Sequence, residues 1–361
     1  MAPGMEETLI SPSPTLPFDL VAEILCRLPV KLLLQLRCLC KSFNSLISDP
    51  KFANKHLRLS TRRHRLMLMS TNDLGHLVLF NSLIPSDFST STVSYPDCLK
   101  IGKSGPYRVC SCNGILCFTM ADGSAILWNP SIRTFKILPP LGMDKQLFLS
   151  LYSFGYNPSV NNYKIVAISG RFGKTKISVH TLGTDSWRTI QDFPYSRQLH
   201  RLGIFVSGTI NWLVVDDGSS FFIVSLDLEN ESYKRLALPN LEDDCFTSLG
   251  VLRDCLCIIT TGDVFLNVWI MKEYGNKESW TKLYSILHMQ DRVIRLYTKA
   301  LYIFEDEQLL IGFYELESYK LKLVVYNSKN GILKIPEIGN IRRCLQLDPE
   351  VYIESLISPC S

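Results

Sequence analysis

Residues 65 to 336 consist mainly of short apolar segments separated by glycine, Asn-Pro and Asp-Gly turns. One unit recurs within them: an apolar strand, a turn, a second strand that ends in a polar residue, and a turn into a third strand. The copies run over Ile115–Pro139, Tyr163–Pro194, Thr209–Pro239, Cys255–Leu283 and Leu309–Pro336, with a degenerate sixth from Arg65 to about Ser89. A plain β-sandwich would show no sustained repeat, so the pattern predicts a ring of similar small sheets.

The repeat has a spacing of roughly 50 residues. The residues taken as equivalent, each after the second strand of its copy, are Asn81, Asn129, Thr181, Asp227, Met271 and Asn327. The steps between them are 48, 52, 46, 44 and 56 residues, which is the size of one propeller blade. The sequence therefore predicts an all-β, propeller-like domain of about six blades over residues 61–361.

Closure of such a ring removes sheet edges that would otherwise aggregate. We therefore expect the last strand, near Val351 to Ile357, to pair with an N-terminal blade. Turn tips such as Thr184–Trp187 and Glu229–Tyr233 place an aromatic residue at the start of the next strand, where it should pack between blades. The tryptophans are expected in the core rather than on a ligand platform; they are Trp128, Trp187, Trp212, Trp269 and Trp280.

The segment from Leu16 to Ser48 differs from the rest because it lacks glycine and its apolar residues follow helical spacing. It predicts three short helices, the first from about Pro17 to Pro29, the second over residues 30–39 and the third over residues 40–48, where Asp49-Pro50 ends it. Residues 1–15, with their Ser-Pro-Ser-Pro stretch, are expected to be a disordered tail.

Of the 33 residues from Leu16 to Ser48, 20 are apolar, more than three short helices can bury among themselves. Two alternatives follow from this excess. The propeller-like domain covers the remaining apolar surface, or that surface is an interaction site for another protein.

The order of residues in this segment resembles the F-box, especially the plant type. The matching positions are Leu16-Pro17, Leu20, Ile24-Leu25, Leu28-Pro29-Val30-Lys31, Leu33-Leu34, Arg37-Cys38, Cys40-Lys41, Phe43, Leu46-Ile47, Asp49-Pro50 and Phe52. The resemblance implies that Phe43 and Leu46 pack the helices. It also implies a set of residues that contact a Skp-family adaptor: Leu16, Pro17, Leu20, Ile24, Leu28, Pro29 and Leu36. The segment departs from the family at Phe43, where tryptophan is common, and at Gln35-Leu36, where a basic-aromatic pair is frequent.

Several phrases further along resemble the F-box-associated, kelch-like domain of plant F-box proteins. They are Asn113-Gly114-Ile115-Leu116, Trp128-Asn129-Pro130, Phe154-Gly155-Tyr156-Asn157, Gly208-Thr209-Ile210-Asn211-Trp212 and Tyr352-Ile353-Glu354-Ser355-Leu356. The expected architecture is an α+β multidomain chain, with a small three-helix F-box over residues 16–60 followed by an all-β propeller-like, substrate-binding domain over residues 61–361.

This resemblance implies the substrate-recognition subunit of an SCF-type (Skp–cullin–F-box) ubiquitin ligase, which recruits a target protein for ubiquitination without catalysing a reaction itself. The adaptor would join the chain to a cullin and a RING subunit, and the target is unknown. The alternative is a propeller that acts as a non-ligase binding module or an enzyme, with the helices only packing against it.

The sequence shows no arrangement of catalytic or metal-binding residues. Gly170–Thr175 ends like a phosphate-binding loop, but Ile168 stands where that loop needs its first glycine. The cysteine pairs 38/40, 110/112 and 255/257 have one intervening residue, unlike the C-x-x-C spacing of zinc sites, so most cysteines are expected to fill the core. We expect no cofactor and no bound metal.

Charge and hydropathy indicate which classes of partner and which cellular compartment to expect. The 38 basic and 34 acidic residues are too balanced for a nucleic-acid-binding surface. No apolar run approaches the roughly 18 to 20 residues of a membrane helix. The expected protein binds neither nucleic acid nor membrane and works in the cytoplasm, the nucleus or both, with its cysteines as thiols.

Overall fold

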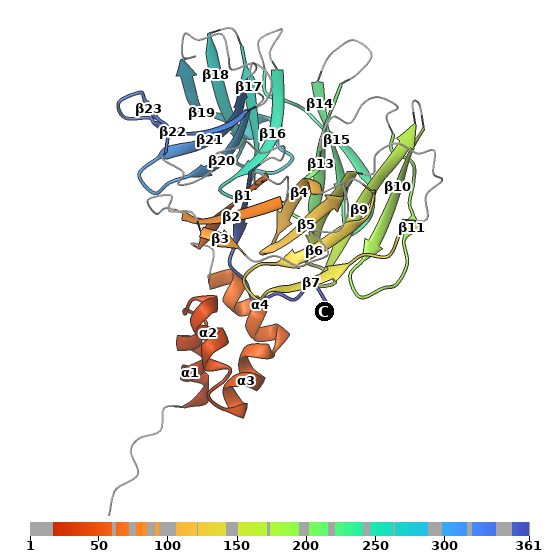
Figure 1. Ribbon diagram of the computed structural model, residues 1–361. Helices are drawn as coiled ribbons and strands as arrows, with labels where there is room; N and C mark the ends of the chain where they lie inside the picture. Colours follow the sequence, from red (N-terminus) through yellow and green to blue (C-terminus); the bar gives the residue numbers. More distant parts are fainter. Residues whose placement is uncertain are drawn as a thin grey trace, which may run out of the picture.

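The computed structural model describes residues 17–59, 63–71, 77–84, 91–93, 106–120, 122–141, 151–171, 174–194, 202–215, 221–240, 246–262, 264–287, 298–315, 320–336 and 349–360. Four short helices come first in the chain, and all the strands follow them. Figure 1 shows the helices as a stalk below a ring of sheets. The expected N-terminal tail and Leu16 lie outside the described residues.

The helices are α1 (Phe18–Leu25), α2 (Val30–Leu36), α3 (Lys41–Ser48) and α4 (Pro50–Leu59). Three were expected, and α4 is the addition. Asp49-Pro50 does end α3, but the same proline begins α4. A first-turn residue needs no intrahelical partner for its N–H, so proline is compatible with the start of a helix. Pro17 and Pro29 likewise precede α1 and α2.

The described strands form six antiparallel sheets of four strands each, arranged as the blades of a propeller. The first blade has the order β24 (Glu350–Ile353), β1 (His64–Thr71), β2 (Leu77–Ile84) and β3 (Ser91–Val93). The second contains β4 (Pro106–Cys112), β5 (Ile115–Met120), β6 (Ala125–Asn129) and β7 (Thr134–Ile137). The third contains β8 (Leu151–Asn157), β9 (Asn162–Arg171), β10 (Lys174–Thr181) and β11 (Arg188–Thr189).

The fourth blade contains β12 (Ile204–Val206), β13 (Thr209–Val215), β14 (Phe221–Asp227) and β15 (Tyr233–Leu236). The fifth contains β16 (Phe246–Leu252), β17 (Cys255–Thr261), β18 (Phe265–Met271) and β19 (Trp280–Leu287), with a 3₁₀ turn at Lys277–Ser279 before β19. The sixth contains β20 (Thr298–Ile303), β21 (Gln308–Glu315), β22 (Lys320–Asn327) and β23 (Ile332–Lys334). The predicted six-bladed propeller is confirmed.

Each of the five regular repeats found in the sequence covers the outer three strands of a blade, and the innermost strand lies just before it. The degenerate sixth repeat, from Arg65 to about Ser89, covers β1 and β2 only, because β3 begins at Ser91. Five of the six equivalent positions are the last residues of β6, β10, β14, β18 and β22. The sixth, Asn81, lies inside β2, whose last residue is Ile84. In the first repeat, the residue taken as equivalent therefore lies three positions before the end of its strand. The inner strand of that blade, β24, comes from the other end of the chain.

The C-terminal strand closes the ring as predicted. β24 pairs antiparallel with β1, with His64 opposite Ile353 and Met67 opposite Glu350. The tail after β24 is also held: the buried amide of Asn129 donates from Nδ2 to Ser355 O at 3.0 Å and to Ile357 O at 2.8 Å. The first blade is thus built from both ends of the chain, so neither end can leave without opening it.

Aromatic residues pack between blades, as the turn tips predicted. Trp187 Nε1 donates to Pro139 O of the preceding blade at 2.8 Å, and Trp280 Nε1 donates to Ala237 O at 3.0 Å. Tyr233 does the same with its hydroxyl, which donates to Gln191 O at 3.2 Å. Trp128 and Trp212 are fully buried. The tryptophans therefore contribute to the core and to the blade interfaces.

Candidate functional site

Five large apolar side chains on α1, on α2 and in the turn after α2 are exposed to solvent. They are Phe18 (51%), Leu20 (51%), Ile24 (53%), Leu32 (44%) and Leu39 (69%). We call these five the exposed apolar set. They lie on α1, on α2 and in the turn that follows α2, the part of the stalk that projects away from the ring in Figure 1. The propeller does not cover them, which removes the first of the two alternatives for these residues.

Helix geometry explains why apolar residues point both inward and outward on α1. Leu25 is buried in the stalk, and Val21, one turn before it, packs against the same core. Leu20 and Ile24 are also one turn apart but lie on the other side, where they meet no covering element. α2 repeats the arrangement, with Val30 and Leu33 buried and Leu32 exposed.

The structure divides the residues predicted to contact an adaptor. Pro17, Leu20 and Ile24 are exposed, whereas Leu28, Pro29 and Leu36 are half-buried. Leu28 and Leu36 pack against the core of the stalk, as do Phe43 and Leu46, which were expected to do so. Leu16 lies outside the described residues. The adaptor contacts of these seven residues stay a prediction.

Sequence reasoning missed Phe18, Leu32 and Leu39, although one signal was available. Leu32, Leu36 and Leu39 fall at positions i, i+4 and i+7, which is one side of a helix. Because every residue from 32 to 34 is leucine, the sequence could not say which of the three points outward.

The surroundings of the exposed apolar set are basic. Residues 16–63 carry nine Lys or Arg and three Asp or Glu. Exposed examples are Arg27, Lys31 and Lys41, while Lys55 is paired with Glu23. An apolar surface with a basic border is complementary to a partner whose apolar surface has an acidic border, and such complementarity speeds association.

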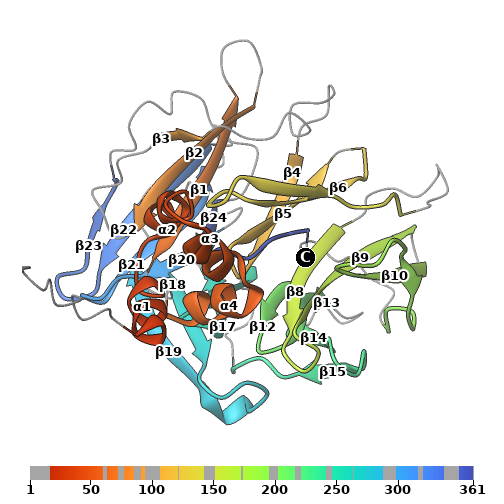
Figure 2. The same cartoon turned by 90° about the horizontal axis from the view of Figure 1, so that it is seen from below.

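The stalk and the propeller share a joint at α4. Buried residues of the stalk, among them Phe52 and Ala53, belong to one apolar cluster with the propeller residues Leu356 and Ile357. Arg63 Nη2 donates to Arg27 O at 2.9 Å, and the Glu354 amide donates to Arg63 O at 3.1 Å. Figure 2 shows the helices against one end of the ring, near the C-terminus.

His56 on α4 is fully buried at this joint, with Nε2 2.9 Å from Leu28 O. Since a carbonyl oxygen only accepts, Nε2 carries the proton of the neutral ring. Burial lowers the pKa of His56, the bond to Leu28 opposes this shift, and nearby Arg63 adds to it. The folded protein therefore disfavours the imidazolium form.

We predict an acid destabilisation that depends on His56. The unfolded chain protonates this residue near its ordinary pKa of about 6.5, whereas the fold resists protonation, so stability is present above that pH and is lost below it. His56→Gln keeps an N–H donor for Leu28 without titrating. Urea unfolding between about pH 5 and 6.5 should show a slope smaller by up to about 1.4 kcal/mol per pH unit. An unchanged slope would contradict the prediction. His64 and His180 also have lowered pKa values and contribute to the slope that remains.

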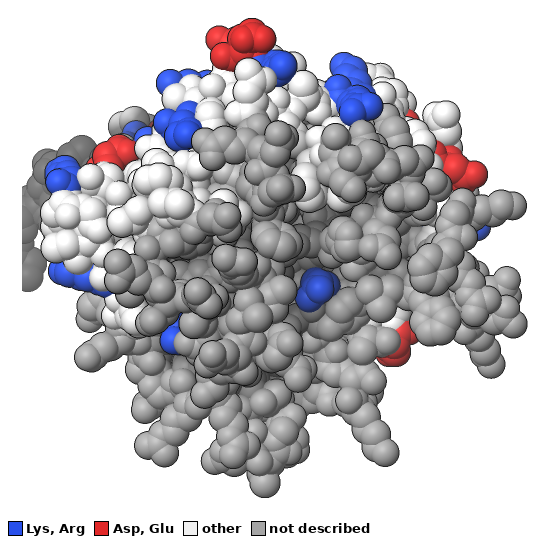
Figure 3. Space-filling model, turned by 90° about the horizontal axis from the view of Figure 1, so that it is seen from above, with Lys and Arg blue, Asp and Glu red and all other residues white. Residues whose placement is uncertain are grey.

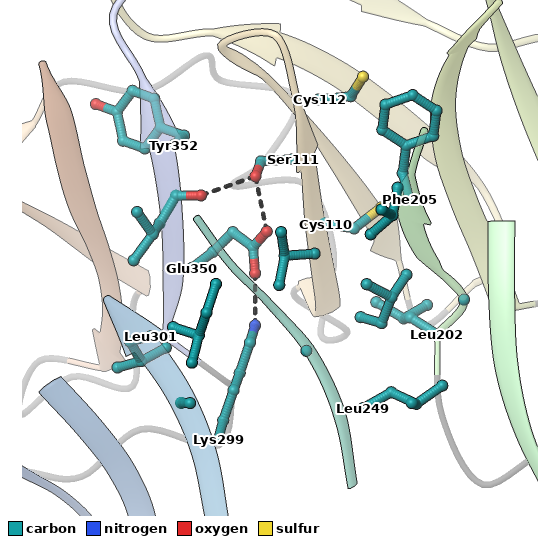
Figure 4. Close-up of a pocket in the computed structure, with 18 of the residues that line it drawn as sticks. Cys110, Ser111, Cys112, Leu202, Phe205, Leu249, Lys299, Leu301, Glu350 and Tyr352 are labelled. Carbon is teal, nitrogen blue, oxygen red and sulfur yellow. Dashed lines mark hydrogen bonds and ion pairs between the residues drawn. The ribbon is translucent and has the colours of Figure 1, made fainter. Parts of the chain in front are cut away.

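A second candidate site is a cavity of about 930 Å³ along the propeller axis. The innermost strands of all six blades line it, and so do Leu202 and Gly203 next to β12. Figure 4 shows Ser111, Lys299 and Glu350 joined by hydrogen bonds on one part of its wall. Cys110 and Cys112 of β4 also line it, and both belong to the same apolar cluster, as expected for alternate residues of a strand.

The remaining features of the described residues add no site. They contain no group of three His, Cys, Asp or Glu placed to hold a metal ion. None of their helices is long and apolar enough to cross a membrane. Five of their cysteines are buried, but Cys38, Cys40 and Cys360 are exposed rather than in the core. On the face opposite the stalk, the described Lys, Arg, Asp and Glu side chains in Figure 3 are mixed in sign.

Family comparison identifies both parts of the chain. Residues 57–359 match the model described as the F-box associated beta propeller domain, which covers most of the sequence. The chain belongs to this F-box-associated propeller family. Residues 14–55 match the F-box domain. The exposed apolar set therefore lies on the F-box, and the cavity lies in the F-box-associated propeller.

Two relatives agree with this assignment over most of their length. An F-box/kelch-repeat protein of Arabidopsis thaliana is 33% identical over 378 residues, covering 98% of this chain and 99% of the relative. The F-box protein CPR1 of the same plant is 28% identical over 386 residues, covering 96% of this chain and 89% of its own length. The homologues of this F-box protein are thus F-box proteins of Arabidopsis.

Among solved structures, the crystal structure of TolB from Acinetobacter baumannii matches with a TM-score of 0.51 and 12% identity. The match covers 84% of this chain and 73% of TolB. At this identity the likeness concerns the propeller fold alone.

Proposed function

We propose that this F-box protein is the substrate-recognition subunit of an SCF-type ubiquitin ligase. The observation that carries the proposal is the exposed apolar set, which lies on the F-box and remains uncovered by the propeller. Large apolar side chains left uncovered on one part of a protein usually mark an interaction site. A Skp-family adaptor bound there would link the chain to a cullin and a RING subunit.

The propeller is the part proposed to hold the target protein. Its blades form a rigid scaffold, and the joint at α4 fastens that scaffold to the F-box through a shared apolar cluster and the Arg63–Arg27 hydrogen bond. A fixed joint would hold a bound target at a constant distance from the adaptor, which raises its effective concentration near the ubiquitin conjugate. In this proposal the chain itself is not an enzyme, and it acts in the cytoplasm or the nucleus.

Co-elution of the full chain with a panel of Skp-family adaptors tests the proposal. We expect a stable complex with at least one adaptor by size-exclusion chromatography. Failure to bind any of them would favour the alternative in which the propeller is an independent binding module or enzyme. That alternative accounts for the packing of α4 on the propeller but not for the exposed residues on α1 and α2.

Ligase action needs a separate measurement, because an adaptor complex can also work without ubiquitin transfer. Leu20→Ala combined with Pro29→Ala removes apolar contacts proposed for the adaptor. Turnover of any protein that co-purifies with the propeller should then slow in cells. Unchanged turnover, with the propeller still bound to that protein, would contradict the ligase role.

A further inference from the structure

The cavity on the propeller axis has the size of a small-molecule site. Its volume of about 930 Å³ lies within the range of ligand pockets in proteins, roughly 300 to 1,000 Å³. Its lining comes mainly from strands and is therefore preformed. We propose that this cavity binds a small, uncharged molecule that has an apolar body and a hydrogen-bond donor such as a hydroxyl group.

The polar wall of the cavity is a short network of charged and neutral groups. Lys299 Nζ lies 2.7 Å from Glu350 Oε2 and 3.1 Å from Pro349 O. Both charged side chains are largely buried, with 15% and 12% of their surface exposed. These two charges compensate each other at contact distance. The other charged side chains in the lining are Arg108, Asp254 and Arg253, which is paired with Glu307, so positive and negative charges balance around the cavity.

The network has one hydrogen-bond donor too few at Ser111. The Ser111 hydroxyl lies 2.8 Å from Glu350 Oε1 and 2.8 Å from Val351 O, and both of these atoms only accept hydrogen bonds. A serine hydroxyl has a single proton, so it can donate a full hydrogen bond to only one of the two oxygens at a time. A ligand O–H or N–H would supply the other oxygen. A ligand carboxylate would instead meet two more acceptors, which is unfavourable.

The other side of the cavity is apolar. Leu202, Phe205 and Leu249 line it, and Figure 4 shows them across the space from Ser111 and Glu350. Their area suits the body of a hydrophobic or aromatic molecule, whose transfer from water is favourable in proportion to the apolar surface buried. A donor at one end and an apolar body at the other together define the ligand class.

A matched series of naphthalene probes tests this class on the full chain. The probes are 2-naphthol, which donates a hydrogen bond, 2-methoxynaphthalene, which cannot, and 2-naphthoate, which is an anion. Isothermal titration should give saturable binding of 2-naphthol, about 5- to 10-fold tighter than the methyl ether, the factor that one net hydrogen bond provides. The naphthoate should bind most weakly. Equal binding of naphthol and ether, or tightest binding of the anion, would overturn the proposal.

Two further measurements place the probe in the cavity. Leu202 is half-buried, and Leu202→Trp places a larger side chain in the apolar side of the cavity. This variant should bind 2-naphthol at least 10-fold more weakly, while its co-elution with the adaptor is unchanged. In the unmodified protein, 2-naphthol should slow hydrogen exchange in β4, β12 and β16 but not in α1 or α2. Protection confined to the helices would assign the binding to the exposed apolar set and refute the cavity site, whether or not the tryptophan variant folds. Neither measurement depends on ligase function.

Discussion

Deletion of residues 348–361 is expected to prevent the protein from folding to a soluble, closed propeller. The deletion removes β24 and the buried side chains Tyr352, Leu356 and Ile357. Burial of each contributes about 1.5–3 kcal/mol, so the loss is roughly 5–9 kcal/mol. It also removes Glu350 and Glu354, the ion-pair partners of Lys299 and Arg65.

This loss is comparable with the whole stability of a typical domain, about 5–15 kcal/mol. The deletion also exposes the inner edge of β1 to pairing with other chains. Expression in the soluble fraction, followed by a thermal melt, measures the effect. Deletion of residues 2–13 is a control of similar size that removes no described residue. A soluble protein with an unchanged melting profile after the C-terminal deletion would show that ring closure is not needed.

The double substitution Leu20→Asp and Ile24→Asp is expected to abolish adaptor binding without destabilising the fold. Both side chains are about half exposed, so charges at these positions remain solvated in the free protein. In a complex the same carboxylates would be buried against an apolar surface without partners, which is costly. Central contacts of an interface contribute about 2 kcal/mol or more each, so the dissociation constant should rise at least about 100-fold.

Surface plasmon resonance against the adaptor identified by co-elution measures this change, and circular dichroism checks the fold. Ile335→Asp is the matched control, because Ile335 is an exposed isoleucine on the propeller, with 65% of its surface accessible. It should leave both affinity and fold intact. If the double variant binds the adaptor as tightly as the unmodified chain, the exposed apolar set is not the adaptor site.

The candidate site was only partly predictable because exposure on a helix depends on what packs against it. Helical spacing and the F-box pattern selected Leu20 and Ile24, which are exposed, together with Leu28 and Leu36, which partly serve the core. The F-box pattern did not select Phe18, Leu32 or Leu39. The apolar character of a residue is local information, whereas the direction in which it faces is decided by the neighbouring helices.

Local patterns in the sequence determined the number of blades, the helical stalk and the strand that closes the ring. Each of these follows from repeat length, from apolar periodicity or from the need to pair sheet edges, and none requires contacts between distant residues to be known. Only the tertiary structure decided which strand is innermost in each blade, how α4 joins the F-box to the propeller, and how Ser111, Lys299 and Glu350 meet on one wall. Those arrangements bring together residues that are far apart in the sequence. Ser111 and Glu350, for example, are 239 positions apart and come from two blades, and they meet because the inner strands of the propeller share one axis.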